Sequence, residues 1–165
     1  MTTILGPDED VSRFVAMAND YPQRFVSQLE PAKDPEPIAL CFNAIVPLPA
    51  SVLGGEYDPK GYEAEHETWG VKWGACDSKL ELHVGGVAVY RYDTPWGPAD
   101  EFWIAASAKF QELTFVQSWD EEYPSMGRDL YRNGTHFIVT RQQRKAPKQW
   151  LKSAHGRLVG IVSAT

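Results

Sequence analysis

Two segments of this chain begin with the same helix signal, a glycine and a proline followed by acidic residues: Gly6–Asp10 and Gly97–Glu101. We expect Gly6 to cap the first helix and Pro7 to be its first position, because proline suits the first turn of a helix and the helix dipole favours acidic side chains there. Apolar residues then recur at helical spacing, at Val11, Phe14, Val15 and Ala18 in the first segment and at Trp103, Ala106 and Phe110 in the second. The pattern predicts one helix to about Asn19 and another that opens at Pro98.

Strand-like segments surround these two helices. Thr2–Leu5 is a short β-rich run, and Leu113–Trp119 alternates as a strand does. Ile38–Val46 carries apolar residues on both faces, which is typical of a largely buried strand. Two turns indicate hairpins: one at Val84–Gly86, between the alternating runs Lys79–His83 and Val87–Tyr92, and a short one at Asn133-Gly134.

The expected order is strand, helix, strand, insertion, strand, strand, helix and strand, followed by a hairpin and a helix. The insertion covers residues 50–68 without a clear period, and a proline-rich loop covers residues 30–37. Pro147 begins the last helix, with Trp150, Leu151 and Ala154 inward. Helices between strands without strict alternation indicate an α+β fold with an antiparallel sheet, and we predict a ferredoxin-like split βαβ unit. The 165 residues suit a single domain.

Charge is unevenly distributed along the chain. Residues 126–165 hold eight basic residues and one acidic residue, a net charge of +7, whereas residues 1–125 hold eight basic and 21 acidic residues, or −13. An acidic body repels phosphate, while a basic end either attracts an anionic partner or simply aids solubility. No apolar run approaches a membrane span, and no secretory signal opens the chain. We therefore expect a soluble, cytoplasmic protein without a membrane partner, with two reduced cysteines.

Motifs that would identify a reaction are absent from the sequence. No phosphate-binding glycine loop, dinucleotide fingerprint or nucleophile elbow occurs, and His66-Glu67 lacks the second histidine of a zinc protease helix. The spacings of Cys41, Cys76, His66 and His83 match no zinc module. We predict no catalytic residue, no metal and no cofactor. Two acidic groups remain as an alternative source of acid–base chemistry or of a divalent-ion site: Glu63, Glu65 and Glu67, and Asp120–Glu122.

Tryptophan-centred motifs carry a family resemblance. Ile45–Pro49, Trp69–Gly74, Thr94–Pro98 and Asp120–Glu122 occur in this order, followed by Gly127. Together they resemble the YubB-type ferredoxin-like family carried by bacteriophages and plasmids. The resemblance implies a family-like core over residues 1–134, a basic extension over 135–165 outside the motif set, and a bacterial host cell. The family has no established reaction to carry over.

The tryptophans allow two interpretations. In the first, the segment around Trp69 and Trp73 is a loop plugged into one side of the sheet, and its indoles are core. In the second, Trp69, Trp73 and Trp96 line a cleft in which Lys72 stacks over an indole. Aromatic walls with a cation suit a nucleobase, a nucleotide or a side chain of a partner.

Nucleic-acid recognition is a separate alternative. RNA-recognition domains share the ferredoxin-like topology and stack bases on aromatic residues of the sheet. Tyr90 and Tyr92 fall on one face of the run Gly86–Tyr92, and the basic C-terminal segment supplies positive charge. The first strand supplies no aromatic residue, and the acidic body opposes phosphate.

The sequence favours a non-enzymatic binding protein of a phage or plasmid. Its expected partner is a host protein or a small nucleotide-like ligand, and interference with a host defence system is the expected role. The candidate contact residues are Trp69, Lys72, Trp73, Trp96, Tyr90 and Tyr92. The alternatives are a single-stranded nucleic-acid-binding module and a small metal-dependent nucleotide-processing enzyme.

Overall fold

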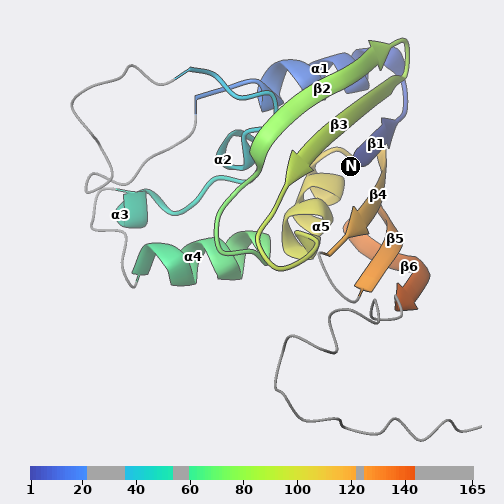
Figure 1. The fold of residues 1–165 in the computed structure, drawn as a ribbon. Helices are drawn as coiled ribbons and strands as arrows, with labels where there is room; N and C mark the ends of the chain where they lie inside the picture. The colour runs from blue at the N-terminus through green and yellow to red at the C-terminus, as the bar shows by residue number, and fades with distance from the viewer. Residues whose placement is uncertain (22–35, 54–59, 122–124, 144–165) are drawn as a thin grey trace, which may run out of the picture.

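The structure, a computed structural model, describes residues 1–21, 36–53, 60–121 and 125–143 (Figure 1). Its six-stranded antiparallel sheet has the order β2-β3-β1-β4-β5-β6. Figure 1 shows α1 and α5 behind the strands. The elements are β1 (Thr2–Leu5), α1 (Asp8–Ala18), α2 (Phe42–Ile45), α3 (Ala50–Leu53), α4 (Lys60–Trp69), β2 (Cys76–Val84), β3 (Val87–Asp93), α5 (Asp100–Lys109), β4 (Thr114–Asp120), β5 (Ser125–Arg132) and β6 (Thr135–Gln143).

The first four strands confirm the predicted ferredoxin-like fold. The chain runs β1-α1, then β2-β3-α5-β4, and the four strands are ordered β2-β3-β1-β4. This is the split βαβ arrangement, in which β1 lies between the two strands that belong to the second half. The predicted hairpin β5–β6 extends the sheet beyond β4, and its turn contains Asn133 (φ 49°) and Gly134 (φ 71°), as a type I′ turn requires. The expected boundary between the family-like core and the basic extension, at Gly134, therefore lies in the turn of this hairpin, with paired strands on both sides of it.

Both predicted helix starts are confirmed with small shifts. α1 begins at Asp8 with Pro7 as its N-cap, where Gly6 was the expected cap, and α5 begins at Asp100 with Ala99 as its N-cap. Acidic residues fill the first turn of each helix. Gly6 instead ties the start of α1 to the β2–β3 turn, because its N–H donates to Gly86 O at 3.1 Å.

The strand predicted over Ile38–Val46 is wrong. The segment contains the single helical turn α2, preceded by one isolated bridge between Asp20 and Ile38. Phe42 and Ile45, three residues apart, are both buried beside α1. An apolar run with side chains on both faces does not distinguish a strand from a short buried helix, and packing decides between them here.

The irregular insertion predicted over residues 50–68 is also wrong where the structure describes it. α3 and α4 occupy residues 50–53 and 60–69, and the buried positions of α4 are Gly61, Ala64, Glu65 and Trp69, at helical spacing. Because two of these four buried residues are a glycine and a glutamate, α4 has no apolar stripe that a hydrophobicity pattern would detect. The loop predicted over residues 30–37 lies outside the described residues except for Glu36 and Pro37, and so does the helix predicted from Pro147.

Aromatic side chains dominate the core between the helices and the sheet. Trp103 of α5 lies at its centre with no exposed surface, and Phe42 stacks on Phe102 with ring centroids 3.7 Å apart. Phe14 of α1 contacts several rings, among them that of Phe115 at 5.4 Å. The largest fully buried side chains are Trp103, Tyr90, Tyr131, Phe14, Phe42, Phe102, Phe115, Ile4, Leu40, Ile45 and Leu113.

The register of the sheet differs between its centre and its edges. The β1–β3, β1–β4 and β4–β5 ladders run without interruption. The outermost strands do not: β2 shifts register against β3 at two places, and β6 shifts against β5 next to Asp129. No helix in the described part of the chain is long and apolar enough to cross a membrane.

Candidate functional site

Trp69 belongs to the core, as the first interpretation of the tryptophans has it, and its candidate role as an accessible contact residue is not supported. It is the last residue of α4 and is 4% exposed. Its indole Nε1–H donates to Val46 O at 2.8 Å, and its ring meets the edge of Phe42 at 5.7 Å. A buried indole whose one polar group is already bonded within the fold has no face or donor left for a ligand.

Trp73 and Trp96, in contrast, are accessible. Trp73 lies in the loop after α4 and is 41% exposed, and Trp96 lies in the turn between β3 and α5 and is 77% exposed. Large aromatic side chains are among the most costly to leave in water. These two are therefore accessible, as the second interpretation requires, although the described residues show only their exposure and not a cleft, and Trp69 fits the first interpretation.

Lys72 joins the two exposed indoles to a third ring. Its Nζ lies 5.5 Å from the ring centroid of Trp73, 5.3 Å from that of Trp96 and 5.4 Å from that of Tyr62 on α4. All three distances are within the range of a cation–π interaction. We call Tyr62, Lys72, Trp73 and Trp96 the aromatic cluster. The predicted proximity of Lys72, Trp73 and Trp96 is present in the structure.

Sequence reasoning misses Tyr62 because the segment that holds it was expected to be irregular. The signal that finds it is helical spacing: Tyr62, His66 and Trp69 follow the i, i+4, i+7 rule. In the structure the Tyr62 and His66 rings lie 6.1 Å apart on α4, with Trp69 at its end.

The backbone around the aromatic cluster is unusual. Gly70, Trp96 and Gly97 have φ values of 76°, 60° and 141°. Glycine adopts such values without strain, whereas for tryptophan a left-handed conformation costs roughly 1–2 kcal/mol. Thr94 Oγ1 donates to Gly97 O at 2.8 Å and so helps to hold this turn. Strained residues that the fold retains are concentrated at functional sites.

Carboxylates border the aromatic cluster. A side chain at Gly70 would collide with Glu101 Oε2, so this carboxylate lies directly against the loop that carries Lys72 and Trp73. A Cβ at Gly97 would lie 3.3 Å from Glu121 Oε1, next to Trp96. Two carboxylates therefore lie against backbone positions next to Lys72, Trp73 and Trp96.

Tyr90 and Tyr92 do not form an accessible stacking surface. Both rings lie on the helix-covered face of β3, and they are 0% and 7% exposed. Tyr92 Oη accepts from Trp103 Nε1 at 2.9 Å and from Gln117 Nε2 at 3.0 Å, and burial raises its pKa to about 12. The prediction that these rings stack on nucleic-acid bases conflicts with this placement, because a base cannot reach them.

A buried polar cluster joins the start of α5 to β5 and β6. Of the described residues, only Asp100, Asp129 and His136 bring three potential metal-ligand atoms within 4.8 Å of one another. Asp129 is fully buried and already accepts from Trp119 Nε1 at 2.5 Å, and its carboxylate lies 2.6 Å from Arg141 NH1. His136 Nε2 lies 3.0 Å from the same carboxylate.

These contacts give the polar cluster a structural role. Tyr131 Oη donates to Asp100 Oδ1 at 2.5 Å, so the second carboxylate also has a partner within the fold. Burial raises the pKa of Asp100, while the Tyr131 hydrogen bond opposes the change. A divalent cation would have to displace the Arg141 guanidinium, which already neutralises Asp129. The residues do not fit an open metal site.

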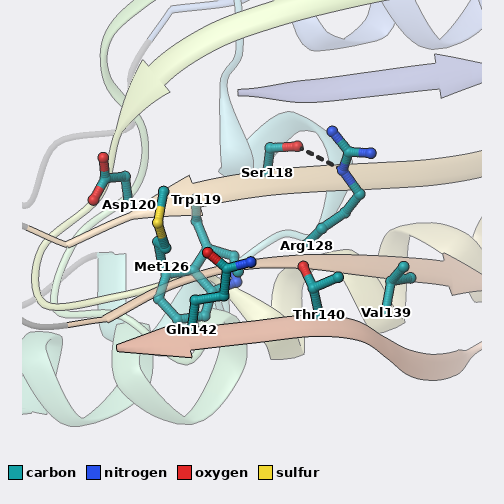
Figure 2. Close-up of a pocket in the computed structure, with 9 residues that line it drawn as sticks. Ser118, Trp119, Asp120, Met126, Arg128, Val139, Thr140 and Gln142 are labelled. Atoms are coloured by element: carbon teal, nitrogen blue, oxygen red, sulfur yellow. Dashed lines mark hydrogen bonds between the residues drawn. The ribbon is translucent and has the colours of Figure 1, made fainter. Parts of the chain in front are cut away.

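A hollow of about 420 Å³ opens over the last three strands (Figure 2). It is lined by Ser118, Trp119, Asp120, Met126, Gly127, Arg128, Val139, Thr140 and Gln142. Among its lining residues, Arg128 Nε on β5 donates to Ser118 Oγ on the adjacent β4 at 3.2 Å. None of the candidate contact residues lines it, and its mixed polar and apolar lining indicates no particular ligand.

Two comparisons with known proteins found a match, one with a family and one with a solved structure. The family described as "Ferredoxin-like domain in Api92-like protein" matches residues 68–150, which run from the end of α4 past β6. A crystal structure of a protein api92 from Yersinia pseudotuberculosis is similar at 16% identity and a TM-score of 0.49, over 68% of this chain. The chain spans 42% of the length of that protein. The search of curated proteins found no match.

The matched residues include Trp69, Lys72, Trp73 and Trp96 as well as β2, β3, α5 and the three strands that follow. They make up half of the chain. The chain therefore belongs to the family of the ferredoxin-like domain in Api92-like protein.

Proposed function

We propose that this chain is a non-enzymatic binding protein and that the aromatic cluster is its contact surface. The observation that carries the proposal is Trp96, which is 77% exposed and has a φ of 60°. Folding alone gives no reason to hold a large aromatic ring in water on a strained backbone. Exposed aromatic residues, tryptophan above all, are enriched among the residues that dominate binding energy in protein interfaces.

The proposed partner is a host protein, in keeping with the resemblance to the YubB-type proteins of phages and plasmids. Under this proposal the chain is a single domain over residues 1–165, acts in the cytoplasm of a bacterial host, and interferes with a host defence system. Trp73 and Trp96 supply accessible apolar surface, and Lys72 supplies a cation between their rings.

A small nucleotide-like ligand is the second candidate. The observation that favours it is the Lys72 ammonium group, which lies between accessible indoles that stack on a base. Two features weigh against it. Glu101 and Glu121 border the aromatic cluster, and residues 1–125 carry a net charge of −13, from eight basic and 21 acidic side chains. Both repel a phosphate group.

The test is capture of a partner from bacterial lysate by immobilised protein, with mass spectrometry. Trp96→Ala is the decisive variant, and Val84→Ala is the matched control, because Val84 is 62% exposed at the end of β2. Trp69→Ala is unsuitable, since it would open a cavity in the core. We expect one protein to be enriched by the wild type and by Val84→Ala but not by Trp96→Ala. A partner that Trp96→Ala and Trp73→Ala both retain would contradict the proposal, as would enzymatic turnover of a substrate.

A further inference from the structure

We infer that the aromatic cluster is a cation-binding site, that Lys72 is its internal occupant, and that the group it takes from a partner is an ammonium or guanidinium group. The inference rests on the proposed function, because it names the chemistry that this same surface recognises. It excludes the nucleotide-like ligand as the main occupant.

Three aromatic rings surround the ammonium group of Lys72. The Lys72 Nζ lies 5.3–5.5 Å from three ring centroids, those of Tyr62, Trp73 and Trp96. The rings come from α4, from the loop after it and from the turn between β3 and α5, so only the folded chain brings them together. Three aromatic rings around one positive charge are the arrangement by which proteins recognise quaternary ammonium and methylated lysine groups.

The charges nearby select a cation over an anion. Glu101 Oε2 lies against Gly70, on the loop that carries Lys72 and Trp73, and Glu121 Oε1 lies near Gly97, next to Trp96. Carboxylates at the border of an aromatic site attract an incoming ammonium group and repel a phosphate. The negative face of each indole acts in the same direction.

Accessibility lets a second cation reach the same rings. Trp96 is 77% exposed and Trp73 is 41% exposed, so a group from solvent can contact both without moving the core. Lys72 is half-buried beside the same rings, and its ammonium group competes with an incoming cation for this position. A site occupied by its own side chain nine-tenths of the time binds an external ligand about tenfold more weakly than the open site.

The experiment compares choline with 3,3-dimethyl-1-butanol, a neutral molecule of the same shape. Binding is followed by the indole Nε1–H signals of Trp73 and Trp96 in nitrogen-15 spectra, with sodium chloride at matched ionic strength as the blank. We expect choline to shift both signals in Lys72→Met at concentrations at least tenfold lower than in the wild type. We also expect it to bind at least tenfold better than the neutral molecule.

The double variant Lys72→Met/Trp96→Ala should lose choline binding, and Val84→Ala should bind choline as the wild type does. Lys72→Gln gives the same comparison if Lys72→Met does not fold. Equal binding of choline and its neutral counterpart would overturn the inference, because it would show an apolar patch without charge preference. Tighter binding of adenosine monophosphate than of choline would overturn it in favour of a nucleotide-like ligand.

The two proposals fail separately. Choline binding to Lys72→Met without any protein captured from lysate would leave the cation site standing and remove the proposed host-protein function. A captured partner that depends on Trp96, together with no choline binding to either Lys72 variant, would keep the function and remove the cation site.

Discussion

Tyr90 and Tyr92 of β3 form a matched pair for mutation, because both are buried and only the Tyr92 hydroxyl group has hydrogen-bond partners among the described residues. Both rings are buried on the same face of the sheet. Tyr92 Oη bonds to Thr2 Oγ1 at 2.8 Å, Trp103 Nε1 at 2.9 Å and Gln117 Nε2 at 3.0 Å. Tyr90 Oη is buried and has no hydrogen-bond partner among the described residues. Removing the two hydroxyl groups should therefore change the free energy of unfolding in opposite directions.

The magnitudes follow from these contacts. A hydrogen bond within a protein contributes about 1 kcal/mol net, and a buried donor left without a partner costs roughly 1–3 kcal/mol. Tyr92→Phe loses three bonds and orphans the Trp103 and Gln117 donors, so we expect it to lower the free energy of unfolding by about 3 kcal/mol. Tyr90→Phe loses no bond and removes a desolvated hydroxyl, so we expect it to raise the free energy of unfolding by about 1 kcal/mol.

The assay is urea unfolding of the two variants and the wild type, followed by circular dichroism, with melting temperatures as a second readout. At roughly 2–4 °C per kcal/mol for a chain of this size, Tyr92→Phe should melt about 9 °C below the wild type and Tyr90→Phe about 3 °C above it. Equal losses of stability in the two variants would refute the reasoning. So would a loss for Tyr90→Phe alone, since it would mean that its hydroxyl has a partner.

Three further substitutions test other contacts. Gly70→Ala should lower the free energy of unfolding by about 2 kcal/mol or more, because φ is 76° at this position and an added Cβ would collide with the Glu101 carboxylate. Urea titration measures this change, and a denaturation midpoint equal to that of the wild type would contradict it. Arg141→Met should lower it by about 3 kcal/mol, because buried Asp129 loses its charged partner, and the double variant Arg141→Met/Asp129→Asn should recover part of the loss. Burial raises the pKa of Asp100 above the ordinary value of 3.8, so the folded chain holds the proton of this carboxyl more tightly than the unfolded chain does. The contribution of Asp100 to the free energy of unfolding therefore falls as pH rises above 3.8. The stability of Asp100→Asn relative to the wild type should accordingly increase with pH above 3.8, and a constant difference across the range would refute it.

Local chemistry made most of the fold predictable. The glycines at Val84–Gly86 and the Asn133-Gly134 pair locate hairpins because few other residues adopt their backbone angles. The α2 and α4 helices were not predictable in the same way. The apolar run that holds α2 has no period of its own, and the buried stripe of α4 includes Gly61 and Glu65, whose burial depends on neighbours distant in the sequence.

The sequence predicted which residue types form the candidate site, aromatic rings around a lysine, but not which of the aromatic residues take part. Trp69 and Trp73 stand four residues apart in one motif, yet one is core and the other is accessible. The Trp69 indole packs on Phe42 and bonds to the carbonyl of Val46, contacts with distant residues that the motif itself does not reveal. Tyr62 joins the aromatic cluster only because α4 is a helix, so the missed helix also concealed the third ring.

The uneven register of the sheet affects how readily another β-strand can pair with its edges. An outermost strand offers unpaired backbone groups on which another molecule can build a continuous β-structure, and Phe137, Ile138 and Val139 of β6 are all more than half exposed. Among the described strands, the register shifts lie only where the two edge strands, β2 and β6, pair with their neighbours. Irregular register increases the local twist of a strand, so these edges are a poorer template for a flat intermolecular ladder than evenly paired strands would be.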